Sequence, residues 1–126
     1  MPSREKYGKW TDGGYLLYNP GDIEIPFEIF FKISPYDAQD ISVTQGGSQI
    51  LLTNVKAKQN NTIFDKYLGI SSVDYIVRGY DENFIYSGNT YNEHISKGDF
   101  FLLKIGENQI ETNVPPATSK MKYLYL

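Results

Sequence analysis

The stretch from Ile23 to Ile33, IEIPFEIFFKI, alternates between apolar and polar positions with a period of two residues. Its odd-numbered positions are all Ile or Phe, whereas its even-numbered positions are charged or proline except for Phe30. Because successive side chains of a strand point to opposite faces of a sheet, this pattern predicts one long strand with a buried side and a solvent-facing side. Pro26 cannot donate a ladder hydrogen bond, so the strand either lies at a sheet edge there or breaks at that residue.

The remainder of the chain has no window with the 3.6-residue period of an amphipathic helix. Short runs rich in Ile, Val, Tyr, Phe and Thr recur instead between Gly, Asn, Asp and Pro clusters, which is typical of all-β proteins. Three pairs of runs predict hairpins around short turn sequences: Ile41–Gln45 with Gln49–Lys56, Val73–Tyr80 with Phe84–Tyr86, and Phe100–Ile105 with Gln109–Val114.

Further strands are expected at Tyr15–Tyr18, at Thr62–Leu68 and at the C-terminal end, which brings the total to about nine. A helix has room only at Ser34–Asp40, and there for one turn at most. Nine strands in one small domain predict an all-β fold, a single antiparallel β-sandwich or jelly-roll-like domain.

We expect the 126 residues to divide into four parts. These are an N-terminal arm at 1–13, a β-sandwich domain at 14–114, a linker at 115–120 that contains two prolines, and a C-terminal strand at 121–126. The alternative for the arm is a frayed chain end.

The C-terminal strand is a candidate for assembly. Its apolar side chains are Met121, Tyr123, Leu124, Tyr125 and Leu126. Backbone hydrogen bonds contribute about 0.5–1.5 kcal/mol each, which roughly cancels the cost of about 1–2 kcal/mol for ordering each residue. Burial of these side chains must therefore decide the docking, and the groove that receives them belongs either to the same chain or to a neighbouring subunit.

A second candidate site follows from the predicted hairpin at Asp81–Asn83. A three-residue loop places Tyr80 opposite Phe84 and Arg78 opposite Tyr86, with all four side chains on one face. The other face then carries the expected core residues Val73, Tyr75, Val77 and Ile85. An arginine among three rings suits a sugar, a peptide or a neighbouring subunit, and the alternative is that this face packs beneath the second sheet or a loop.

Composition excludes several classes of function. The chain has no cysteine, its net charge is −3, and its twelve Lys and Arg residues are scattered, so we expect no disulfide, no thiol catalysis and no nucleic-acid partner. No apolar run is long enough for a membrane span or a signal-peptide core, so we expect no membrane partner and synthesis in the cytoplasm.

No catalytic or metal-binding signature is present either. His94 is the only histidine and stands outside any recognised nucleophile motif. The acidic turn Asp81-Glu82-Asn83 and the pair Asp37 and Asp40 do not fit a calcium-binding loop. We therefore predict a protein that is not an enzyme and that holds no metal and no cofactor.

In its small all-β design and its richness in Asn, Tyr and Gly, the chain resembles virion proteins of bacteriophages such as head-decoration, head-fibre or tail-accessory proteins. The resemblance covers most of the chain but no motif, so it assigns no functional residue. It implies a structural protein of the virion that forms homo-oligomers or attaches to other particle proteins. The alternative is a glycan- or peptide-binding module that uses the face of Arg78, Tyr80, Phe84 and Tyr86.

Overall fold

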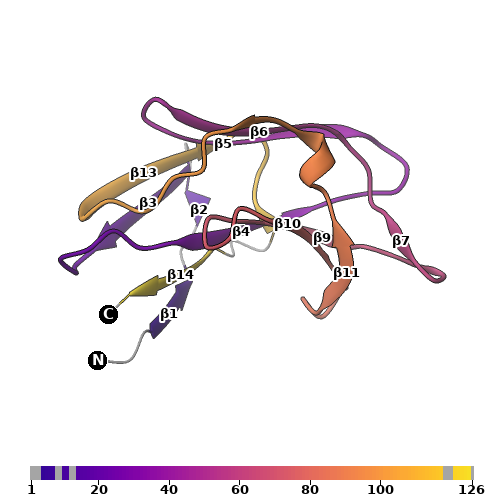
Figure 1. Cartoon of the computed structure of the whole chain (residues 1–126), viewed down its shortest axis with the longest axis horizontal. Helices are drawn as coiled ribbons and strands as arrows, with labels where there is room; N and C mark the ends of the chain where they lie inside the picture. Colours follow the sequence, from indigo (N-terminus) through magenta and orange to yellow (C-terminus); the bar gives the residue numbers. More distant parts are fainter. Residues whose placement is uncertain (1–3, 8–9, 12–13, 118–120, 126) are drawn as a thin grey trace.

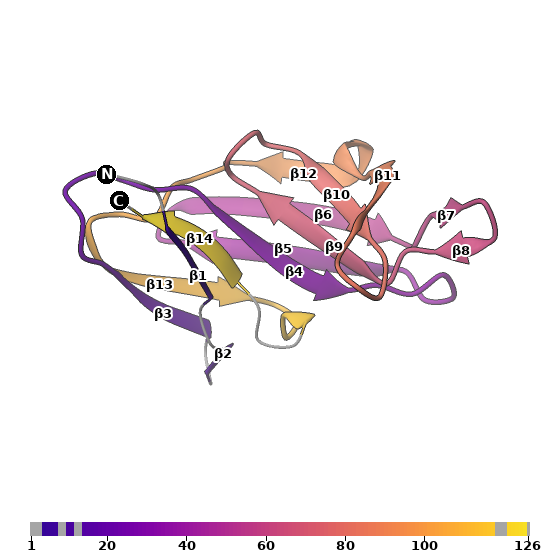
Figure 2. The same cartoon turned by 90° about the horizontal axis from the view of Figure 1, so that it is seen from below.

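Two antiparallel sheets face each other and enclose an apolar core (Figures 1 and 2). The computed structural model describes residues 4–7, 10–11, 14–117 and 121–125. The first sheet has the strand order β1 (Arg4–Tyr7), β14 (Met121–Tyr125), β4 (Phe27–Lys32), β9 (Tyr67–Ser71), β10 (Val77–Tyr80) and β11 (Tyr86–Thr90). The second sheet has the order β12 (Ile95–Gly98), β6 (Ser48–Val55), β5 (Gln39–Gln45), β13 (Gly106–Thr112), β3 (Gly14–Asn19) and β2 (Trp10–Thr11).

A small hairpin of β7 (Gln59–Asn60) and β8 (Ile63–Phe64) extends from one end of the sandwich (Figure 2). One 3₁₀ turn, η1 (Asn92–His94), joins β11 to β12. The described residues thus contain fourteen strands, five more than the sequence predicts, and the antiparallel β-sandwich is confirmed. Among these residues no helix has the length and apolar character that a membrane crossing requires.

The alternating stretch supplies the centre of the core, as the sequence predicts. Ile25, Phe27, Ile29, Phe31 and Ile33 are all buried, with at most 8% of their surface exposed. Regular strand structure begins only after Pro26, so the break at this proline is confirmed, and Ile25 makes a single bridge to Leu103. The expectation for Ile23 is wrong: this side chain is 47% exposed, because the chain turns at Gly21 before the strand begins.

The hairpin of β5 and β6 is also confirmed. Gln45 pairs with Ser48 across Gly46 and Gly47, which makes a two-residue turn. Gly46 has φ of +57°, a conformation that suits glycine at such a turn. The strand at Tyr15–Tyr18 is likewise confirmed as β3, with Tyr15 buried on the core side.

The predicted hairpin of Phe100–Ile105 with Gln109–Val114, whose turn would be Gly106-Glu107-Asn108, is wrong. These three residues begin β13, and the segment from Phe100 to Ile105 is irregular apart from the bridge at Leu103. The reason is the buried side chain of Asn108, whose Oδ1 accepts from Lys104 N at 2.7 Å while its Nδ2 donates to Lys104 O at 2.8 Å. These hydrogen bonds place the turn before Gly106, so strand β13 begins at Gly106.

Two smaller expectations are also corrected. The run from Thr62 to Leu68 is not one strand, since β8 ends at Phe64 and β9 begins at Tyr67. No helical turn forms at Ser34–Asp40, because Ser34 Oγ accepts from Tyr36 N at 3.0 Å and β5 already starts at Gln39.

The two ends of the chain add strands to the first sheet. Within the chain, β14 pairs antiparallel with β4 on one side and with β1 on the other, and the three lie side by side in both views (Figures 1 and 2). The expected arm also contributes β2, which pairs with β3. In the expected linker, Pro116 and Ala117 are buried. Positions 118–120 and Leu126 lie outside the described residues.

We predict that Gly14→Ala destabilises the fold by at least about 1 kcal/mol, as urea denaturation would measure. Gly14 has φ of +133°, and a Cβ atom there would overlap the backbone carbonyl oxygen of Ile110 on β13. Gly47→Ala is the matched control, since its Cβ would enter open space. Equal urea midpoints for the two variants would contradict the close approach of β3 to β13.

Candidate functional site

Five aromatic side chains meet on the face of the first sheet that points away from the core. We call Phe30, Tyr67, Tyr80, Phe84 and Tyr86 the outer ring cluster. Phe30 lies edge-on to both Tyr80 and Phe84, with ring centroids 5.3 Å apart in each pair. Phe84 stacks on Tyr67 at 4.1 Å, and Tyr80 lies 6.2 Å from Tyr86. The rings therefore form one continuous layer across β4, β9, β10 and β11.

Strand periodicity and one glycine bring these rings together. Phe30 on β4 points opposite to the core residues Ile29 and Phe31, as alternation requires. Its neighbour on β9 is Gly69, where a Cβ atom would come within 2.7 Å of the Tyr80 ring and 3.1 Å of the Phe30 ring. The missing side chain of Gly69 thus makes the space in which the two rings meet.

The structure gathers the four side chains of the predicted platform, but in a different register. Tyr80 pairs with Tyr86, not with Phe84, and Arg78 pairs with Thr90, not with Tyr86. The predicted three-residue loop is wrong because the side chain of Asp81 closes a longer one: its Oδ1 accepts from Asn83 N at 2.8 Å and from Ile85 N at 3.0 Å.

This longer loop folds back over the sheet and inserts Phe84. Phe84 has φ of +59°, a left-handed conformation that is strained for a bulky residue. Its ring lies between Phe30 and Tyr67. Contacts with these rings offset the strain, so the loop is held by the aromatic side chain that it carries.

Only one of the four residues expected on the core side is buried. Val77 is buried, whereas Val73, Tyr75 and Ile85 are 59%, 58% and 62% exposed. The expectation for these three is wrong, because residues 72–75 form a turn and β10 begins at Val77. Asp74 stabilises this turn by accepting from Ile76 N at 3.3 Å.

The polar groups beside the rings are paired within the chain. Both Nη atoms of Arg78 donate to the Asp74 carboxylate, and this hydrogen bond holds the pKa of Asp74 below its ordinary value. The guanidinium of Arg78 also lies 5.6 Å from the ring centre of Tyr86. The hydroxyl of Tyr80 donates to Glu28 Oε2 at 2.6 Å. The surface that a partner could contact is therefore chiefly aromatic ring surface. Tyr86 offers the most of it, since this side chain is 46% exposed.

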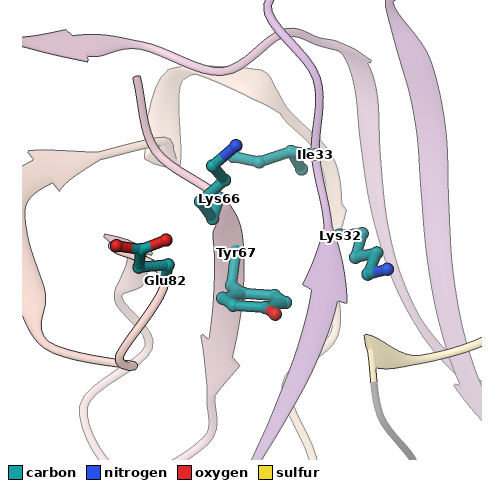
Figure 3. Close-up of a pocket in the computed structure, with 5 residues that line it drawn as sticks. All are labelled: Lys32, Ile33, Lys66, Tyr67 and Glu82. Carbon is teal, nitrogen blue, oxygen red and sulfur yellow. The ribbon is translucent and has the colours of Figure 1, made fainter. Parts of the chain in front are cut away.

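A pocket of about 390 Å³ opens at the end of the cluster (Figure 3). It is lined by Lys32, Ile33, Lys66, Tyr67 and Glu82. Figure 3 shows Tyr67 at the centre, with Glu82 on one side and Lys32 on the other. The ring that stacks on Phe84 therefore also forms a wall of this pocket.

Two members of the cluster, Phe30 and Tyr67, are absent from the residues that the sequence predicts for the site. Phe30 leaves a signal, since it is the one large apolar side chain on the polar face of the alternating stretch. Tyr67 leaves none, because it reaches the cluster only through the pairing of β9 with β4 and β10.

The described residues contain no group of three or more His, Cys, Asp and Glu side chains placed to hold a metal ion. His94 lies in η1 with Nδ1 3.1 Å from Thr53 O. Of the candidate assembly residues, Met121, Tyr123, Leu124 and Tyr125 lie on β14, where the structure describes their backbone pairing.

Comparisons with protein-family models, curated proteins and solved structures found nothing that matches this chain.

We predict that stability falls above about pH 10 and falls less steeply in Tyr80→Phe. Burial first, and then the hydrogen bond to Glu28, raise the pKa of Tyr80 well above its ordinary value of 10.0; burial likewise raises the pKa of Tyr15 and of Tyr91. Below pH 10 both folded and unfolded chains keep these protons, so the stabilisation is complete there. Above it the unfolded chain releases them first, which favours unfolding.

The measurement is the free energy of unfolding in urea between pH 8 and 11. Tyr80→Phe should reduce the slope by up to about 1.4 kcal/mol per pH unit. Tyr36→Phe removes a hydroxyl from a side chain that is 82% exposed and is the matched control. A Tyr80→Phe slope equal to that of the unmutated chain would contradict the prediction.

Proposed function

We propose that this chain is a non-enzymatic structural protein that assembles with copies of itself through the outer ring cluster. The observation that carries the proposal is a difference between the central strands of the two sheets on their outer faces; the second sheet does expose Leu16 and Tyr18, but on β3. In the second sheet the outward positions of β5 and β13 are polar: Ser42, Thr44, Gln109 and Glu111. The first sheet carries five rings in the corresponding place.

An outer sheet face of a sandwich normally meets water and carries polar side chains. Tyr67, Tyr80 and Phe84 are half-buried by one another, and Tyr86 remains largely open. Tyrosine and phenylalanine are enriched at protein interfaces, where they contribute a large share of the binding energy. We therefore expect the rings on this face to contact a second protein surface and not solvent.

The charges around the cluster favour a copy of the same chain as that surface. Lys32, Lys66 and Glu82 surround the pocket at one end, and the ion pair of Arg78 with Asp74 lies at the other. A two-fold interface brings the same patch of both copies together, so a patch with both signs of charge can complement itself. A role in the particle of a bacteriophage extends this proposal and rests on the resemblance in composition and design alone.

Tyr86→Ala tests the assembly. If the chain associates through this face, loss of its most exposed ring should weaken self-association roughly 30-fold, the equivalent of about 2 kcal/mol. Sedimentation velocity over a concentration series measures the effect. Tyr18→Ala is the matched control, because Tyr18 is 64% exposed on the second sheet. A chain that stays monomeric at all concentrations, or equal weakening by both variants, would refute the proposal.

A second candidate function is glycan binding, favoured by the pocket beside Tyr67. Its volume of about 390 Å³ falls in the range of small-molecule sites, and a ring flanked by Lys66 and Glu82 offers a stacking surface with polar groups for hydroxyls. We expect Lys66→Ala with Glu82→Ala to abolish retention of the chain on an oligosaccharide array. The control pair Lys97→Ala with Glu107→Ala removes exposed charges elsewhere. Absence of any glycan retained by the unmutated chain would eliminate this function.

A further inference from the structure

A second pocket lies at the base of the β7–β8 hairpin, apart from the pocket beside Tyr67. It has a volume of about 190 Å³, and it is lined by Asn60, Asn61, Ile63, Phe64, Asp65, Asp81, Tyr86 and Ser87. In both Figure 1 and Figure 2 the hairpin projects from the end of the sandwich at which β11 lies. The side chain of Asn60 holds it there by donating to Ser87 O at 2.7 Å.

Asp65 is the unusual residue of this pocket. It follows β8 directly and is 2% exposed, an uncommon position for a carboxylate. Its Oδ2 accepts from Tyr91 Oη at 2.5 Å and from Asn89 Nδ2 at 3.1 Å, and it lies against Gly79. Its Oδ1 has no hydrogen-bond partner among the residues that the structure describes. A buried acceptor is normally satisfied, so this oxygen indicates a missing donor.

The nearby cations are engaged elsewhere. Lys58 Nζ donates to Glu93 at 2.6 Å and to Thr90 O at 2.5 Å, and Arg78 is paired with Asp74. Within the described part of the chain no Lys or Arg lines the pocket, whereas the carboxylates of Asp65 and Asp81 both do. The pocket therefore carries negative charge with no positive partner in these walls, which favours a cation over an anion or a neutral ligand.

The other walls indicate an organic cation. Ile63, Phe64 and Tyr86 are 64%, 40% and 46% exposed and offer apolar and aromatic surface. An alkyl chain packs against such surface while its ammonium group lies near ring faces and carboxylates. Calcium requires six to eight oxygen ligands, and the described residues contain no group of three or more His, Cys, Asp and Glu side chains placed to hold a metal ion.

The volume of the pocket limits the size of the organic cation that it can bind. Sites for drug-sized ligands and cofactors span about 300–1,000 Å³. A pocket of about 190 Å³ accommodates one amino-acid side chain or one small amine. We propose that this pocket binds an alkylammonium group, supplied either by a lysine side chain of another protein or by a free aliphatic amine. Tyr86 belongs both to this pocket and to the outer ring cluster, so the variants that test the pocket are placed at Asp65 and Asp81 and leave the rings unchanged.

The binding test uses isothermal titration calorimetry on the full chain, at a concentration where sedimentation shows a single species. The probes are n-butylammonium, Nα-acetyl-lysine methylamide and the neutral analogues 1-pentanol and the same lysine derivative acetylated on Nζ. We expect both cations to bind at least tenfold more tightly than the neutral analogues, with affinity that falls as salt rises. Tighter binding of the lysine derivative assigns the site to a protein partner, and tighter binding of n-butylammonium assigns it to a free amine.

Variants distinguish binding in the pocket from an effect of the net charge of the chain. Asp65→Asn and Asp81→Asn each remove one charge. The amide introduced by Asp81→Asn keeps the oxygen that closes the loop. If Asp65→Asn does not fold, the result for Asp81→Asn therefore tests the proposal. Each should weaken n-butylammonium binding about tenfold. Asp22→Asn and Asp37→Asn remove exposed charges and should change it less than twofold.

Three results would overturn the proposal and leave water as the partner of Asp65. They are no saturable binding below about 10 mM, equal binding of the neutral analogues, and equal losses in the control variants.

Discussion

The two-sided burial of β4 is the constraint on which the rest of the structure depends. Its inner face places Phe27, Ile29 and Phe31 at the centre of the core, with at most 1% exposure. Its outer face carries Phe30, which is 6% exposed and so must also be covered. The second sheet covers the inner face, and the rings of the outer cluster cover the outer one. Fold and candidate site therefore meet in one strand.

The sequence predicts the parts of the fold that local rules decide. Alternation identifies β4, a short run of Tyr and Leu identifies β3, and a glycine pair identifies the β5–β6 hairpin, because each signal lies within a few residues of the structure that it specifies. Elsewhere one side chain overrides the local signal. Gly106-Glu107-Asn108 has the composition of a turn, yet the amide of Asn108 reaches back to Lys104 and receives a hydrogen bond from Gln45 across the sheet at 2.6 Å.

The sequence predicts four residues of the candidate site, misses Phe30 and Tyr67, and does not predict the geometry. Arg78, Tyr80, Phe84 and Tyr86 do gather, but the carboxylate of Asp81 sets the length of the loop and hence the register. The sequence pattern does not predict the burial of Asp65, because this residue lies in a run from Thr62 to Leu68 that has the composition of a strand. Its burial follows from its packing against Gly79 and from the hydroxyl of Tyr91, which are remote in sequence.

The place of β14 between β1 and β4 sets an order of events during synthesis. In the described part of the sheet, β1 pairs with β14 alone, so Arg4–Tyr7 have no strand to join until Met121–Tyr125 have left the ribosome. Strand β1, although made before the others, therefore cannot join the sheet before β14 does. Pairings between such distant segments raise contact order and slow folding. Until β14 is made, the edge of β4 that it will occupy is an unpaired strand edge, the kind of surface that can pair with strands of other chains.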